Sequence, residues 1–239
     1  MPTAAERKAL RAGLYKLNEN MVTLAELSEL AIRKAVDSLA RLDHASADEV
    51  FTLDQEIYAL QVEVERTCGD LIALHAPVAG DLRTITTSLK ITTDLDRIGR
   101  YAKDIAETAL ELEGTATGEF DKLPDLPKMV DQTIEMVDKA VDAFVRRDAD
   151  SVRNLAEVDD TIDLMHDEAF RNIVADMKGG TLETEIGARY ILVVRYLERI
   201  ADHAVNIGER VVYMVTGERV PRVRAAERAK LENHGRGET

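Results

Sequence analysis

The sequence has no tryptophan, one cysteine and five prolines among its 239 residues, and aromatic residues make up 4% of it. So few aromatic and turn-forming residues argue against a β-sandwich, a barrel or a propeller, which need many strands and turns. The single cysteine, Cys68, excludes an internal disulfide framework and fits a reducing compartment. We therefore expect a cytoplasmic protein that is built from helices.

Long apolar segments and an excess of positive charge are also missing. The longest stretch without Asp, Glu, Lys or Arg covers residues 71–80 and is interrupted by Pro77. A transmembrane helix needs about 20 apolar residues, so we expect no membrane insertion, and no apolar run of a signal peptide follows the N-terminus. The 45 acidic and 31 basic residues give a net charge of −14, which disfavours nucleic-acid binding.

The sequence does contain apolar residues at helical spacing. In the first segment, small and apolar side chains recur in steps of four and three, which predicts a helix packed against other helices. Proline and glycine residues separate the periodic segments into six long helices, because proline ends helices and glycine caps them. We expect them at about residues 3–43, 46–75, 79–113, 123–147, 150–178 and 182–216. The predicted fold class is all-α, since long helices with short connections pack as bundles.

An internal repeat divides these helices into two sets of three. Residues 96–107 resemble residues 198–209, with acid, Arg, Ile, Ala, Ile and Glu in register at an offset of 102. Earlier in each half, Asp54 matches Asp159 at an offset of 105. A repeat of this length is too long for a solenoid and predicts two tandem three-helix bundles. We expect the bundles at residues 1–115 and 120–218, followed by a disordered tail at 219–239.

The last predicted helix carries an acidic stripe beside its apolar face. At about 100° per residue, Glu198, Asp202, Asn206 and Glu209 lie within about 80° of one another. Carboxylate oxygens suit Fe, Mn, Mg or Ca, and Zn also accepts them, so Glu198 and Asp202 are candidate metal ligands. The alternative is a solvated helix face whose acids pair with neighbouring arginines.

The matching stripe on the third predicted helix begins with Asp96, a further candidate ligand. Here Arg100 stands where the last helix has Asp202. A cation at this position would repel a metal ion and can instead form an internal ion pair with Asp96. If the stripes bind metal, we therefore expect this one to bind poorly or not at all.

A third acidic row on the fourth predicted helix contains Glu135 and Asp138, which could supply opposing metal ligands or form a plain solvent-facing surface. Catalytic patterns are absent from the sequence. No Glu-x-x-His pair of the ferritin type, no His-Glu-x-x-His motif and no phosphate-binding glycine-rich loop occurs. Because no nucleophile is accompanied by a base and an orienting group, we assign no catalytic residue and expect no enzyme.

Four segments together resemble the PhoU family, regulators of phosphate uptake. They are APVAGDLR at 76–83, DLDRIG at 94–99, YLERIADHAVNI at 196–207 and VVYMVTGE at 211–218. Each segment alone is weakly specific, but their order and the duplicated layout identify the chain as a member. The resemblance covers about residues 5–220.

This resemblance implies two similar three-helix bundles, often a homodimer, and no catalytic activity. It also implies metal clusters held by acid-x-x-x-Asp motifs in some members. Glu198 and Asp202 match that motif, whereas Asp96 matches only its first acid because Arg100 replaces the second. The implied metals at the acidic helix faces are Fe, Zn or Mg.

The implied function is that of a phosphate-specific transport system accessory protein. Such a protein is a negative regulator of the phosphate-starvation response and an adaptor between a phosphate ABC transporter, through its ATPase, and a sensor histidine kinase. Two alternatives remain open on the residues alone. One is a carboxylate-bridged metal-binding protein or enzyme, and the other is a generic helical scaffold.

Overall fold

The computed structural model describes residues 4–112 and 125–220, which contain six α-helices and no strand. This confirms the all-α prediction. The helices are α1 (Ala4–Arg41), α2 (His44–His75), α3 (Ala79–Glu111), α4 (Asp125–Arg146), α5 (Leu155–Gly179) and α6 (Thr184–Thr216). The predicted domain boundaries at 115 and 120 lie outside the described residues, as does the predicted tail beyond residue 220.

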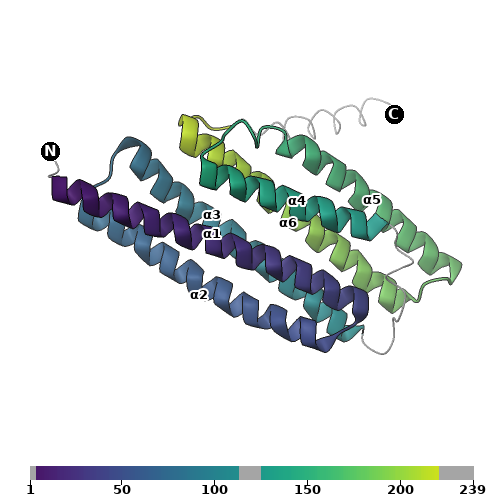
Figure 1. Ribbon diagram of the computed structural model, residues 1–239. Coiled ribbons are helices and arrows are strands. Elements are labelled where there is room, and N and C mark those ends of the chain that lie inside the picture. Colours follow the sequence, from purple (N-terminus) through teal and green to yellow (C-terminus); the bar gives the residue numbers. More distant parts are fainter. Residues whose placement is uncertain (1–3, 113–124, 221–239) are drawn as a thin grey trace, which may run out of the picture.

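The helices form two bundles that lie against each other along their length (Figure 1). In the first bundle, α1, α2 and α3 all pack against one another, and in the second α4, α5 and α6 do the same. The two bundles meet where α3 packs on α6 and where α1 packs on α4. The arrangement confirms the predicted pair of tandem three-helix bundles.

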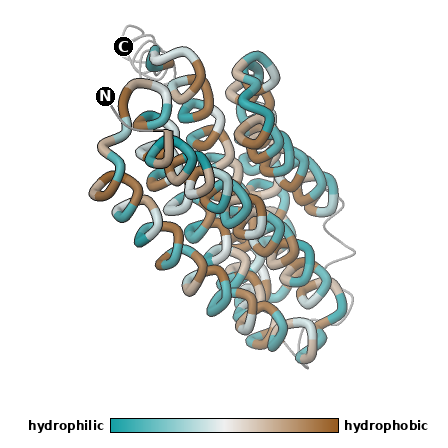
Figure 2. Tube along the Cα trace, turned by 60° about the vertical axis from the view of Figure 1, so that its left-hand side comes forward, coloured by the Kyte–Doolittle hydropathy of each residue, from teal (hydrophilic) through white to brown (hydrophobic). Residues whose placement is uncertain are grey.

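The predicted apolar seam forms the core. Leu17, Met21 and Leu24 are each no more than 1% exposed, and apolar and polar residues alternate around every helix in Figure 2. Burying a side chain of this size stabilises the fold by about 1.5–3 kcal/mol. The seam therefore fixes which face of each helix points inward, and with it the position of the acidic stripes.

The starts of α2 and α5 are among those that differ from the sequence prediction. The second helix begins at His44, because the Asp43 carboxylate accepts hydrogen bonds from the backbone N–H groups of Ala45 and Ser46. The fifth helix begins at Leu155 rather than at residue 150. There the Asp148 carboxylate accepts from the N–H groups of Asp150 and Ser151 and stabilises a turn instead of a helix.

A glycine allows α3 to approach α2 closely. A Cβ at Gly99 would lie 2.8 Å from Ile57 Cδ1, which is closer than such contacts permit. The corresponding residue of the second bundle is Ala201, which is fully buried. This contact sets the spacing between the helices that carry Asp54 and Asp96.

None of the helices in the two described ranges is long and apolar enough to span a membrane.

Candidate functional site

Glu198 and Asp202 lie one turn apart on α6, as the sequence predicted, and each is paired with an arginine of the same helix. Glu198 is 6% exposed, and its Oε1 accepts a hydrogen bond from Arg195 Nη1 at 2.9 Å. Asp202 Oδ2 accepts from Arg199 Nη1 at 3.2 Å. Glu198 Oε2 is buried and accepts no hydrogen bond within the described residues, with Arg199 Nε 3.6 Å away.

The surroundings of Glu198 disfavour its negative charge. Burial raises the pKa of Glu198, the charges of Asp202 and Asp163 raise it further, and Arg195 and Arg199 lower it. Asp163 belongs to α5, so acids from two helices act on one another here. Sequence reasoning missed Asp163 as a member of this group, although it lies one turn after Asp159, which the repeat had already matched to Asp54.

The donor set on α6 fits a hard cation in chemical type. Both side chains offer carboxylate oxygens, and the buried Oε2 of Glu198 lacks a hydrogen-bond donor, which a bound cation would compensate. Within the two described ranges, no group of three or more His, Cys, Asp or Glu side chains is arranged to hold a metal ion. The two carboxylates are therefore at most part of a ligand set, and arginines supply the positive charge around them.

Asp96 on α3 is engaged differently. Its side chain is 7% exposed, and Arg100 Nε donates to its Oδ2 at 2.9 Å. The predicted internal ion pair is thus confirmed. The pair borders a polar pocket between α2 and α3 that is lined by Asp54, Arg97, Arg100, Tyr101, Lys103 and Asp104. At this pocket Arg100 occupies the position that is equivalent to Asp202 on α6.

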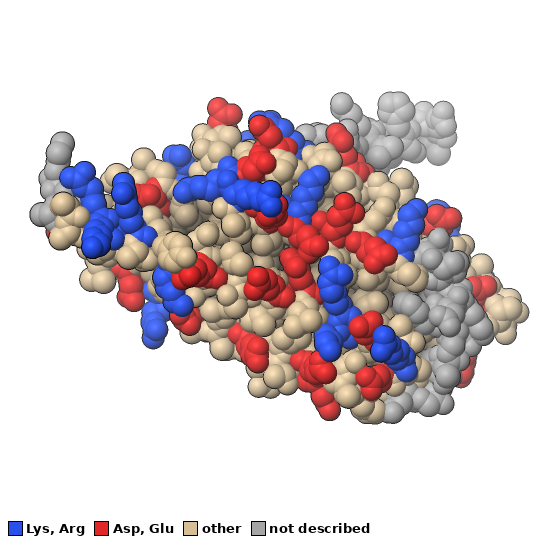
Figure 3. Space-filling model, viewed as in Figure 1, with Lys and Arg blue, Asp and Glu red and all other residues tan. Residues whose placement is uncertain are grey.

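The candidate ligands on α4 lie elsewhere. Asp138 faces α1, where Arg33 Nη2 is 3.6 Å from its Oδ2 and the Glu29 carboxyl shares a hydrogen bond with it. Burial and the neighbouring Asp138 raise the pKa of Glu29 to about 8. Glu135 is exposed, and Figure 3 shows acidic side chains along the junction of α1 and α4. The structure thus places Asp138 at the boundary with the first bundle, against α1, and does not bring it to the α6 stripe.

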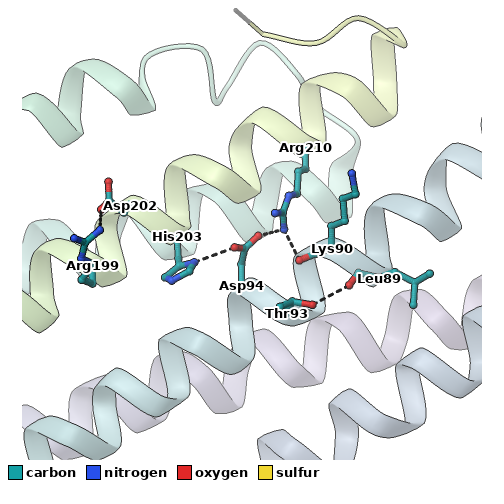
Figure 4. A network of polar contacts seen from close by, with 8 residues as sticks. All are labelled: Leu89, Lys90, Thr93, Asp94, Arg199, Asp202, His203 and Arg210. Atoms are coloured by element: carbon teal, nitrogen blue, oxygen red, sulfur yellow. Dashed lines mark hydrogen bonds and ion pairs between the residues drawn. The ribbon is translucent and has the colours of Figure 1, made fainter. Parts of the chain in front are cut away.

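A buried polar network joins the two bundles at the contact of α3 with α6. Asp94 of α3 is 4% exposed, and His203 Nδ1 lies 2.9 Å from its Oδ1 (Figure 4). Arg210 of α6 pairs with the other carboxylate oxygen and also donates to the carbonyl of Lys90. Residue spacing within one helix does not predict this network, because the network depends on how the two bundles align.

The same interface carries an aromatic contact at the positions related by the repeat. At the offset of 102, Asp94 corresponds to Tyr196 and Tyr101 corresponds to His203. The rings of Tyr101 and Tyr196 stack with their centroids 5.9 Å apart. One side of the interface is therefore charged and the equivalent side is aromatic.

The matches to known proteins cover both bundles. The PhoU domain model matches twice, at residues 21–109 and 126–211. A PhoU homolog of Thermotoga maritima, named as a phosphate-specific transport system accessory protein, is 35% identical over 204 residues, covering 85% of this chain and 88% of its own. A homolog with the same description from Zymomonas mobilis is 31% identical, with 90% of each chain covered.

Two solved structures share the fold. The crystal structure of PhoU from Pseudomonas aeruginosa matches with a TM-score of 0.81 and 32% identity, over 87% of this chain and 99% of the other. The phosphate transport system regulatory protein PhoU from Streptococcus pneumoniae matches with a TM-score of 0.81 and 29% identity, over 89% and 99%. Since the fold, both repeats and the sequence agree, the chain belongs to the PhoU family.

Proposed function

We propose that this protein is an accessory and negative regulator of phosphate transport that acts as an adaptor. In this role it contacts the ATPase of a phosphate ABC transporter and a sensor histidine kinase in the cytoplasm. When phosphate is plentiful it holds the kinase in its non-phosphorylating state. The observation that carries the proposal is the match of both bundles to the PhoU domain, together with relatives named as phosphate-specific transport accessory proteins.

The surface of the molecule supports an adaptor. The described residues form long helices, and a helical segment of a partner can bind along the face of such helices. The net charge of −14 favours association with basic partner faces and accelerates the encounter. A second copy of the chain is a further proposed partner, in a homodimer.

A metal ion at α6 is the second part of the proposal. Glu198 and Asp202 would hold Fe, Zn or Mg, and the bound ion would supply the positive charge that now comes from Arg195 and Arg199. The buried Oε2 of Glu198 supports this assignment, because it is a strong acceptor without a hydrogen-bond donor. Since Arg100 occupies the matching position on α3, we leave Asp96 out of the ligand set.

The adaptor role is tested by co-purification from cells grown at high and at low phosphate. We expect the tagged chain to capture the transporter ATPase and the sensor kinase, with recovery of the kinase depending on phosphate. In parallel, deletion of the gene is expected to derepress phosphate-starvation genes at high phosphate. Full repression in the deletion strain would contradict the negative-regulator role.

The metal role is tested by elemental analysis of protein that is purified without added metal. The variant E198Q with D202N should lose the bound metal, while E135Q should keep it, because Glu135 is an exposed acid of α4 whereas Glu198 is a buried acid of α6. An oxidase assay on the loaded protein separates a regulator from a metalloenzyme. Equal metal content in the E198Q/D202N variant and the unmodified chain would remove these residues from the ligand set.

A further inference from the structure

The repeat places four positions of the first bundle in register with four positions of the second. Asp54 and Tyr58 on α2 correspond to Asp159 and Asp163 on α5 at the offset of 105. Asp96 and Arg100 on α3 correspond to Glu198 and Asp202 on α6 at the offset of 102. These equivalent positions are named here as the first-bundle site and the second-bundle site.

In the structure the four positions of the first-bundle site interact with one another, and three of the four positions of the second-bundle site do so. In the second-bundle site, the charge of Asp163 on α5 acts on Glu198 of α6. In the first-bundle site, Asp54 and Tyr58 of α2 act on the Arg100 guanidinium of α3. The same helix pair of each bundle therefore brings equivalent positions near one another.

The copies differ at two of the four positions. The second-bundle site has four acidic residues, whereas the first-bundle site has two acids, one arginine and one tyrosine. The arginines near Glu198 are Arg195 and Arg199, which lie beside the acidic stripe and not in it. In the first bundle, the residue equivalent to Arg195 is the uncharged Thr93. Only in the first bundle does a cation occupy a stripe position itself.

The Arg100 side chain is 53% exposed, and its guanidinium is paired with a buried carboxylate of the first-bundle site. Arg100 Nε donates at 2.9 Å to Asp96, whose side chain is 7% exposed, and Asp96 and Asp54 both raise the pKa of Arg100. Lys103 Nζ lies 3.8 Å from Asp54 and adds a second positive charge at the same pocket. A metal ion at this place would meet three cations, Arg97, Arg100 and Lys103, and would have to displace the donor of the buried Asp96 carboxylate.

We propose that Arg100 is a built-in cation of the first-bundle site, which balances Asp96 and Asp54 permanently and leaves this bundle without a metal site. The family motif that implies a metal at Asp96 therefore does not apply to this bundle. Any metal response of the protein then passes through the second bundle alone. The last statement rests on the metal role proposed above, whereas the role of Arg100 stands on the first bundle by itself.

The first experiment converts one site into the other. In the E198Q/D202N background, Y58D and R100D restore four acids to the first-bundle site, and Mn²⁺ binding is measured by titration calorimetry. We expect no binding in the background, binding after the conversion, and loss of that binding when D96N is added. Mn²⁺ binding to the unconverted first bundle, or a folded converted variant without binding, would overturn the proposal. This result does not depend on whether the unmodified second bundle binds metal.

A second experiment remains informative if the converted variant does not fold. In R100A, hydrogen exchange of α2 and α3 should become about tenfold faster, because a hydrogen bond to a charged group is lost. Millimolar methylguanidinium should slow that exchange again, while methylammonium at the same concentration should not. R146A is the matched control, since Arg146 forms an exposed ion pair with Asp142 in the same i, i+4 spacing. Exchange in R100A that equals the unmodified chain, or that neither cation restores, would contradict the built-in cation.

Discussion

The two bundles of this protein preserve the same core but not the same charges. Ile57 and Ile162 occupy equivalent positions and are both fully buried. The same holds for the equivalent pair Ile98 and Ile200. Near these isoleucines, the first bundle has Arg100 where the second has Asp202, and Tyr58 where the second has Asp163. Packing restricts buried apolar positions to side chains of similar volume, whereas a partly exposed charge can change sign if its neighbours compensate. At these equivalent positions the core residues are the same and the residues of the acidic stripes differ.

The largest expected effect tests whether the two cores contribute equally. Ile57→Ala and Ile162→Ala should each destabilise the protein by about 2–5 kcal/mol, because both leave a cavity in a packed interior. Urea denaturation measures the free energy of unfolding, with Leu164→Ala as the control, since that side chain is 69% exposed. A loss below about 1 kcal/mol at either isoleucine would show that its bundle is loosely packed.

The next effect concerns the contact between the bundles. Asp94→Ala removes the common partner of His203 and Arg210 and should cost about 2–3 kcal/mol, since hydrogen bonds to charged groups are lost at a buried position. Hydrogen exchange should accelerate on α3 and α6 together. Tyr196→Phe, at the equivalent position, keeps the aromatic stack and should change little. Faster hydrogen exchange on α3 alone would show that the Asp94 network does not stabilise α6.

A smaller effect distinguishes the helix spacing in the two bundles. Gly99→Ala brings a Cβ to 2.8 Å from Ile57, so Ile57 has to move, and we expect a cost of about 1–2 kcal/mol. The second bundle already has alanine at the equivalent position, residue 201. The double variant G99A with I57V should recover part of the loss, because it removes the methyl group in the way. No recovery in thermal unfolding would place the strain elsewhere.

The smallest effect is a pH dependence at the junction of α1 and α4. Burial and Asp138 raise the pKa of Glu29 from 4.5 to about 8. The folded state then binds a proton that the unfolded state releases between these values, so this contribution to stability is present below pH 4.5 and is lost as the pH rises through about 8. Thermal midpoints of E29Q should fall less over this range than those of the unmodified chain. Parallel curves would exclude Glu29 as the titrating group.

Local patterns in the sequence predicted the helices and the apolar faces, because both depend on residues three and four apart. The start of α5 was predicted five residues too early, since Asp148 stabilises a turn that competes with a helical cap. Glu198 and Asp202 share a face for the same local reason that made the prediction possible. Asp163, Asp94 and Asp138 acquire their partners from other helices, and that alignment cannot be read from spacing within one helix.

The stacked Tyr101 and Tyr196 on one side of the α3–α6 contact, and Asp94 with His203 on the other, have a consequence for the symmetry of the contact. A contact in which each surface meets its own copy is the isologous geometry of a two-fold dimer. In a symmetric dimer of identical subunits, the two contacts related by the axis consist of the same residues. One of them therefore cannot be aromatic while the other is charged. Because both halves lie in one chain here, each half carries its own residues at the contact and is free of that symmetry.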